Sequence, residues 1–189
     1  MPSAWNIHYD RWVIDDGEPE REIGEQFEWF VLAFGSKDRL ARVAQPTQST
    51  IETPDYSYNV AAKVVYVSAT RAVIDFGLSA VGSSDLLPTG THVGEYVAGE
   101  IKLIFQHWTD PLPDDTYASM AHEWYVEAMW ADLTPYRSGD GSGRWLIRDE
   151  QRVQYEQITS TREKNAKAYV LRCALAIPGT ASDESGRPH

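Results

Sequence analysis

Large apolar and aromatic side chains recur at every second position along most of this 189-residue sequence, from Trp5 near the start to Ile177 near the end. Successive side chains of a β-strand point to opposite faces, so a period of two is typical of strands with one buried face. The 3.6-residue period of an amphipathic helix is nowhere kept for a dozen residues. The sequence therefore predicts a nearly all-β protein.

The alternation divides into about eight candidate strands that are separated by turn-forming residues. These strands span Trp5–Ile14, Gln26–Phe34, Tyr56–Val67, Arg71–Leu78, Glu95–His107, Glu123–Leu133, Arg152–Thr161 and Lys167–Ile177. Both faces of the second strand are apolar, which predicts burial on two sides. The stretch Ser79–Thr91 is rich in Ser, Gly and Pro and is expected to be a loop.

This number of strands is enough to close or nearly close a small barrel. We therefore expect an all-β fold, a small antiparallel and partly open barrel of the OB or SH3 kind, extended by a C-terminal β-meander. Gly99 inside the fifth strand favours the sharp bend that a barrel needs to turn a corner. A β-sandwich is the alternative.

The alternation is interrupted at Thr109–Thr116, a stretch with two prolines and three aspartates. We interpret it as a boundary between a β-barrel core over 1–108 and a β-meander over 109–178, packed together as one globular unit. The last stretch, 179–189, has no apolar anchor and is predicted to be disordered.

A short motif lies between the first two strands. Gly17-Glu18-Pro19 is followed by Ile23–Trp29, which reads Ile-Gly-Glu-Gln-Phe-Glu-Trp. This resembles the opening of actinobacterial small β-barrel domain families of unknown function, in which G-x-P precedes a hydrophobic-G-D-x-x-x-W pattern. The strands Val60–Val67 and Gly94–Leu103 also resemble those families, so the resemblance covers residues 1–105, with Glu25 where the families have Asp. It implies a small β-barrel and carries over no functional residue.

The formal net charge of −11 at pH 7 is unevenly distributed. Asp15–Glu28 contains seven acidic residues against Arg21 alone, whereas Arg137–Arg172 contains eight basic and five acidic residues. A negative surface repels a phosphate backbone, which argues against nucleic acid as a partner. The acidic segment would instead attract a basic protein.

Several features bear on where the protein resides. The sequence has no run of about 18 apolar residues, so no membrane span is expected. Its N-terminus lacks the basic and apolar regions of a secretory signal, and Cys173 is the only cysteine, which excludes an internal disulfide. These features predict a cytoplasmic protein.

Histidine and carboxylate residues come closest to a catalytic pattern where one strand ends and another begins. His107 and Asp110 lie at the end of the fifth strand, and His122 and Glu123 lie at the start of the next. If the chain turns back here, these side chains would meet as a general acid–base pair requires. The histidine spacing fits no metal-binding helix, and the glycine-rich stretch 139–143 lacks the end of a P-loop, so neither a metal nor a cofactor is expected.

Three functions are compatible with these features. We favour a non-enzymatic binding or regulatory module that recognises a protein partner through an acidic, aromatic-edged surface. The residues expected to contact that partner are Trp12, Asp15, Asp16, Glu18, Glu20, Glu22 and Trp29.

The alternatives belong to other classes. One is a single-stranded nucleic-acid-binding β-barrel that uses aromatic strand residues and the basic stretch Arg137–Arg172. The other is a hydrolase-type enzyme with the His107, Asp110, His122 and Glu123 site. An exposed edge strand would also allow a homo-oligomer to form.

Overall fold

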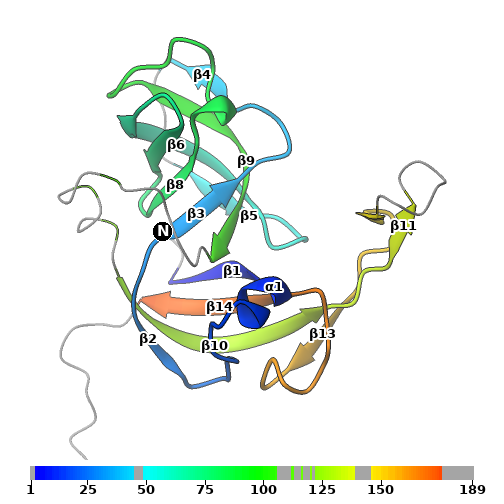
Figure 1. Ribbon diagram of the computed structural model, residues 1–189. Helices are drawn as coiled ribbons and strands as arrows, with labels where there is room; N and C mark the ends of the chain where they lie inside the picture. The colour runs from blue at the N-terminus through cyan, green and yellow to red at the C-terminus, as the bar shows by residue number, and fades with distance from the viewer. Residues whose placement is uncertain are drawn as a thin grey trace, which may run out of the picture.

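The computed structural model describes residues 3–44, 49–105, 112, 116, 120, 122–138 and 146–175 (Figure 1). Strands predominate in this part of the chain, and none of its helices has the length and apolar character needed to cross a membrane. The short helical segments are α1 (Arg11–Asp15) and η1 (Ser84–Leu86). The strands are β1 (Ala4–Asp10), β2 (Gln26–Phe30), β3 (Leu32–Gly35), β4 (Ala41–Val43), β5 (Thr50–Glu52), β6 (Tyr58–Val67), β7 (Arg71–Asp75), β8 (Ser79–Ser83), β9 (Tyr96–Phe105), β10 (His122–Asp132), β11 (Tyr136–Ser138), β12 (Leu146–Arg148), β13 (Tyr155–Ile158) and β14 (Ala168–Leu175).

Five of these strands form a small closed barrel. β9, β3, β8, β7 and β6 pair in that order, and β6 pairs back onto β9 to close the ring. The prediction of an all-β protein with a small barrel is confirmed. We expected a partly open barrel, whereas the pairing of β6 with β9 closes it. In addition, β3 and β8 run parallel, so the barrel is not purely antiparallel.

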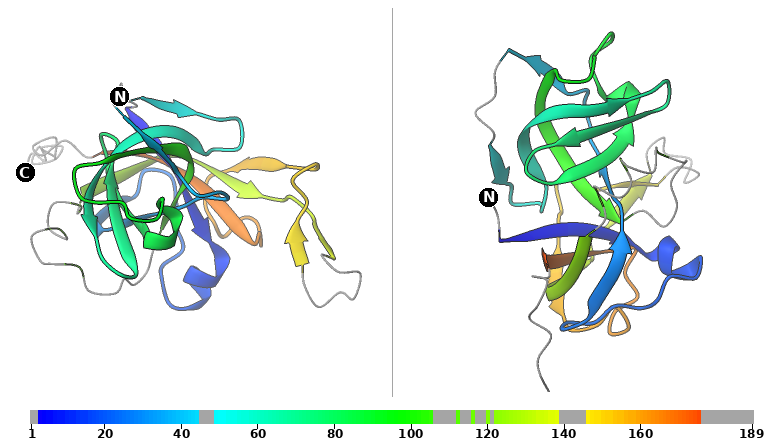
Figure 2. Two further views of the ribbon diagram at one scale, coloured as in Figure 1. Left: turned by 90° about the horizontal axis from the view of Figure 1, so that it is seen from above. Right: turned by 90° about the vertical axis from the view of Figure 1, so that its left-hand side faces the viewer.

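A second group of strands, β2, β13, β10, β14 and β1, forms a lower sheet beneath the barrel (Figures 1 and 2). β1 pairs antiparallel with β14 along its whole length and joins β9 in parallel at Ile7 and His8, so it links the two parts. One edge of β10 carries both β2 and β13, and its other edge carries β14.

This pairing differs from the expected C-terminal meander, because β13 and β14 both pair with β10. β14 occupies one edge of β10 and β13 the other, where the eleven residues of β10 also leave room for β2. Strands from both sides of the division predicted between 1–108 and 109–178 therefore share the lower sheet.

Several stretches of the chain differ locally from the sequence-based expectation; for example, the predicted strand Gln26–Phe34 is divided into β2 and β3. The first predicted strand ends at Asp10, and Arg11–Asp15 forms a helical turn that buries Val13. The stretch Ser79–Thr91, expected to be a loop, contains β8 (Ser79–Ser83). Its small buried residues give little apolar contrast, which is why the alternation did not reveal the strand.

The main core lies where the barrel meets the lower sheet. The Trp5 ring of β1 packs against the rings of Tyr58 and Phe76, with centroid separations of 5.3 and 5.7 Å. Further along β1, Tyr9 packs edge-to-face on Phe105 at 5.0 Å. Such ring pairs add to the free energy gained by removing apolar area from water. The odd-numbered face of β1 thus joins the two parts.

Gly82 in β8 is expected to tolerate no side chain. A Cβ atom built there would lie 2.5 Å from Cζ of the Phe34 ring, which is itself buried. We predict that Gly82→Ala lowers the free energy of unfolding by about 2 kcal/mol, as overpacking does. Urea denaturation measures this change. Combining Gly82→Ala with Phe34→Leu should cost less than the sum of the two single changes, and strict additivity would contradict the explanation.

Candidate functional site

The even-numbered face of the lower sheet carries polar and aromatic side chains in place of a second core. Asp10 of β1 and Asp132 of β10 lie on either side of Ala168 in β14, and Tyr155 of β13 follows Asp132 in the same row. Residues directly opposite each other in a sheet share a face, so these side chains lie together. We call this surface the polar face; it comprises Asn6, His8, Asp10, Ala128, Trp130, Asp132, Tyr155, Ala168, Val170 and Arg172.

The turn between β5 and β6 lies against this face. The Tyr56 ring of the turn is 5.0 Å from the Trp130 ring and 4.7 Å from the Tyr155 ring. Tyr56 has a φ of 61°, in the left-handed region that favours glycine. Its ring contacts and a hydrogen bond from its N–H to the Thr53 carbonyl (3.1 Å) offset the strain of about 1 kcal/mol. The turn is therefore held in place by the sheet.

Asp55 in the same turn is held as an ionised carboxylate. It accepts hydrogen bonds from the hydroxyls of Thr53 and Ser57, each at 2.5 Å, and the Lys102 ammonium lies 3.4 Å from its other oxygen. Burial alone would raise the pKa of Asp55, but these hydroxyls and the charge of Lys102 outweigh it and keep the pKa well below its ordinary value.

His8 is buried between the sheet and this turn. Its Nε2 lies 3.4 Å from the Tyr56 carbonyl oxygen, and only 9% of the residue is exposed. Burial, and next to it the positive charge of Lys102, lower the pKa of His8 to about 4. The imidazole is therefore neutral at physiological pH and adds no positive charge to the polar face.

Arg148 of β12 provides a cation next to Asp132. Its Nε donates to the Asp132 carboxylate (2.9 Å), its Nη1 to Glu150 (2.7 Å) and its Nη2 to the Tyr155 hydroxyl (2.9 Å). The guanidinium also lies over the Tyr155 ring, 5.7 Å from the centroid. These bonds fasten the β11–β12 hairpin, which extends away from both sheets in Figure 1, to the polar face.

Asp10 has a different environment from Asp132. The side chain accepts one hydrogen bond, from the Trp12 indole N–H at 3.2 Å, and no cation of the described residues pairs with it. Burial raises the pKa of Asp10, and the charge of Asp132 raises it further. The pKa of Tyr136 is raised by burial and then by the charges of Asp132 and Asp10.

The acidic segment Asp15–Glu28 is largely paired within the fold. Arg21 binds Glu25 (2.6 Å) and Glu18 (3.3 Å), and Arg11 binds Glu20 (3.2 Å) and Asp15 (3.1 Å). Glu20 also accepts a hydrogen bond from Thr161. Glu18 and Glu20 thus hold the connection to β2 against the lower sheet.

The remaining predicted contact residues are Trp12, Asp16, Glu22 and Trp29. Trp12 is 49% exposed, and Asp16 and Glu22 are exposed with no ion pair to any residue that the structure describes. Trp29 lies in β2. Of the predicted contact residues, Asp16 and Glu22 are therefore the carboxylates that remain open to a partner.

Only half of the predicted His and carboxylate cluster can be placed. His107 and Asp110 lie outside the described residues, so their meeting with His122 and Glu123 stays a prediction. His122 packs edge-to-face on Trp124 at 5.9 Å, and burial lowers its pKa. Glu123 accepts a hydrogen bond from the Gln26 amide at 3.3 Å. Among the residues described, no three His, Cys, Asp or Glu side chains gather as a metal site requires.

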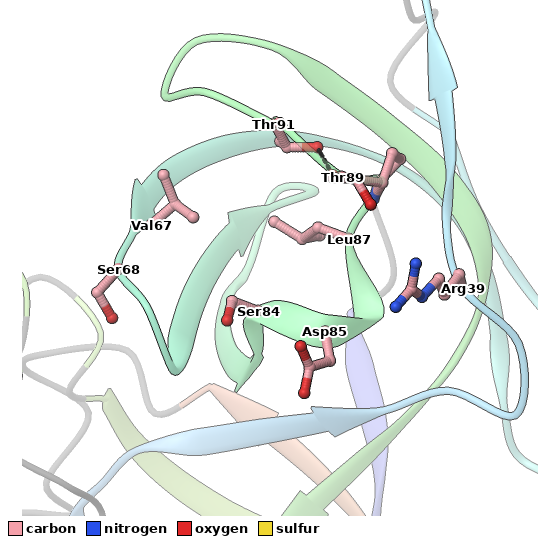
Figure 3. Close-up of a pocket in the computed structure, with 10 residues that line it drawn as sticks. Arg39, Val67, Ser68, Ser84, Asp85, Leu87, Thr89 and Thr91 are labelled. Atoms are coloured by element: carbon pink, nitrogen blue, oxygen red, sulfur yellow. Dashed lines mark hydrogen bonds between the residues drawn. The ribbon is translucent and has the colours of Figure 1, made fainter.

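A cavity of about 290 Å³ opens at one end of the barrel. Figure 3 shows Leu87 pointing into this end, with Arg39 and Asp85 at its edge. The hydroxyls of Ser84 and Thr91 in its lining donate to backbone carbonyls, at 2.9 and 2.6 Å. With these hydroxyl protons already engaged and both charged groups exposed, the cavity lacks the convergent polar groups of a ligand site.

Comparison with protein families, curated proteins and solved structures finds no match to this chain. The resemblance of residues 1–105 to actinobacterial barrel domains therefore stays a prediction. The fold itself defines the class, a small closed β-barrel joined to a second sheet.

Sequence reasoning did not single out most of the polar face. Asp10, Asp132, Tyr155 and Arg148 come from separate elements, and only strand register brings them together. One signal was present, because Asn6, His8 and Asp10 alternate with the apolar residues of the first strand.

Proposed function

We propose that this protein is a non-enzymatic binding module that recognises a basic protein partner through an acidic, aromatic-edged surface. One observation carries the proposal most directly, namely that the half-exposed Trp12 indole is hydrogen-bonded to the Asp10 carboxylate. Its N–H donates to Asp10, and the Asp16 backbone N–H closes the same helical turn by donating to the Trp12 carbonyl at 2.9 Å.

This arrangement combines two elements that protein interfaces use. A large exposed indole supplies apolar area that a partner can bury, and tryptophan is enriched among the residues that dominate binding free energy. Unpaired carboxylates around it attract a positively charged surface and accelerate association. The net charge of −11 adds a long-range field of the same sign.

The expected contact residues divide into two groups. Trp12, Asp16, Glu22 and Trp29 would contact the partner directly. Asp15, Glu18 and Glu20 would contribute to the electrostatic field while pairing with Arg11 or Arg21 in the fold.

The test uses a fluorescein-labelled octalysine peptide and measures its anisotropy with the purified protein at low and high salt. We expect binding at low salt that weakens as salt rises, because exposed charges are then screened. The double variant Asp16→Asn and Glu22→Gln, which removes two negative charges, should weaken octalysine binding about threefold. Trp12→Ala should weaken it about fivefold.

The matched control removes two negative charges from the barrel, by Asp38→Asn and Asp85→Asn. Both residues are exposed. This variant has the same net charge as the Asp16 and Glu22 variant, so a purely global effect would weaken both equally. Equal loss in the two variants, or no binding of octalysine at low salt, would contradict the proposal.

A further inference from the structure

Among the residues that the structure describes, no cation pairs with Asp10 on the polar face. Asp132 has Arg148, Asp55 has Lys102, and Glu52 lies 3.6 Å from Arg172. Asp10 has only the Trp12 indole N–H, although it is half-buried. A carboxylate withdrawn from water without a cation is unfavourable, so this position favours a ligand that brings one.

The row of residues across the sheet has a small and partly exposed side chain, Ala168, next to Asp10. Ala168 lies directly opposite Asp10 on one side and directly opposite Asp132 on the other. Opposite Cβ atoms are about 5 Å apart, so the two aspartate Cβ atoms are separated by about 10 Å with only a methyl group between them. A cationic nitrogen placed over Ala168 would reach Asp10 at the usual charge-assisted distance of about 2.8 Å.

Aromatic side chains flank this space. Trp12 is 49% exposed and Tyr136 is 43% exposed. Both provide π faces, which attract an ammonium or guanidinium group. The Tyr136 backbone lies opposite Arg148 in the hairpin, so the same element that neutralises Asp132 also positions the Tyr136 ring.

The residues of β1 that share the face of Asp10 carry no positive charge at physiological pH. Asn6 is fully buried on the same face of β1. Its side-chain amide N–H donates to the Glu52 carboxylate at 2.8 Å, and its Oδ1 has no hydrogen-bond partner among the described residues. His8 lies between Asn6 and Asp10 and is neutral at physiological pH. An anionic or acceptor-rich ligand would therefore be repelled here, whereas a cationic donor would be attracted.

We propose that the space over Ala168, between Asp10, Trp12 and Tyr136, receives one arginine or lysine side chain from a basic partner protein. This inference rests on the proposed function and names the group that the partner contributes. The carboxylate of Asp10 would accept hydrogen bonds from the cation, and the two rings would cover its faces.

The experiment follows the indole N–H resonance of Trp12 by NMR, with the resonance assigned from a Trp12→Phe variant. The probes are capped pentapeptides with a central arginine, lysine or citrulline between glycines. Citrulline has the shape of arginine without its charge. We expect the arginine and lysine peptides to shift the resonance saturably, and the citrulline peptide to leave it unchanged at the same concentrations.

Variants then separate this site from the wider acidic surface. Asp10→Asn keeps the shape and an acceptor for Trp12, and should weaken the arginine peptide about tenfold. Asp38→Asn is the matched control, because Asp38 is exposed and belongs to the barrel; it should change the affinity less than twofold. In the unaltered protein, the affinity should fall as Asp10 protonates, at a pH above the ordinary aspartate range.

The outcomes distinguish the two proposals. If octalysine binding depends on Asp16 and Glu22 but Asp10→Asn changes nothing, the cation site is overturned and the binding module stands. If citrulline binds as well as arginine, the site recognises shape without charge and the inference is wrong. If octalysine itself fails to bind, both proposals fall.

Discussion

Trp5→Ala is expected to lower the free energy of unfolding by about 4 kcal/mol, the largest loss among the changes considered. Trp5 is 2% exposed, and its ring contacts Tyr58 and Phe76 across the junction of the barrel and the lower sheet. Removing the indole would leave a cavity that neither part can fill without moving the other. Guanidinium denaturation followed by far-UV circular dichroism measures the change.

Two further variants keep this prediction testable if the alanine variant does not fold. Trp5→Phe retains part of the ring volume and should cost about half as much. Trp12→Ala removes the same side chain from an exposed position and should change the stability by less than about 0.5 kcal/mol. Similar losses for Trp5→Ala and Trp12→Ala would mean that the junction is not the main core.

The strands were predictable because burial on one face leaves a period of two in the sequence. The odd-numbered residues of β1, Trp5, Ile7 and Tyr9, are all buried, as the alternation indicated. Strand order was not predictable in the same way. β1 pairs with β14, which lies more than 150 residues further along the chain, and nothing in either segment alone specifies that partner.

The site was only partly predictable for the same reason. Trp12 and the acidic segment Asp15–Glu28 could be identified from the sequence, and Trp12 is indeed exposed. Glu18 and Glu20 could not be distinguished from Asp16, because their ion pairs with Arg21 and Arg11 exist only once the chain folds. The pairing of Asp132 with Arg148 depends on the β11–β12 hairpin, in which β12 returns alongside β11 and ends at Arg148.

Lowering the pH from 7 toward 4 is expected to destabilise the protein, with His8 as a main cause. The pKa of His8 is about 4 in the folded state against an ordinary value of 6.5. Between these values the unfolded chain binds a proton that the folded chain does not, so the free energy of unfolding falls as the pH falls. The full difference corresponds to about 3 kcal/mol. Urea denaturation at a series of pH values measures it.

His8→Gln should flatten this dependence, because glutamine does not titrate. Subtracting the pH dependence of the His8→Gln variant from that of the unaltered protein also removes the contribution of His122, because burial lowers the pKa of His122 in both proteins. Asp55→Asn is the control with a different window. The folded pKa of Asp55 lies below its ordinary 3.8, so its stabilisation is present above that pH and is lost only as the pH falls further.

The position of His8 explains why this titration would affect more than stability. Protonation would place a positive charge near Lys102 in the buried contact between the β5–β6 turn and the polar face, and this repulsion and the loss of hydration outweigh the hydrogen bond to the Tyr56 carbonyl. We therefore expect the Tyr56 ring to leave Trp130 as His8 titrates, which the Trp130 indole resonance would report. If the His8 ring in the folded protein titrates near 6.5, or if His8→Gln keeps the full pH dependence, the buried neutral imidazole is not the cause.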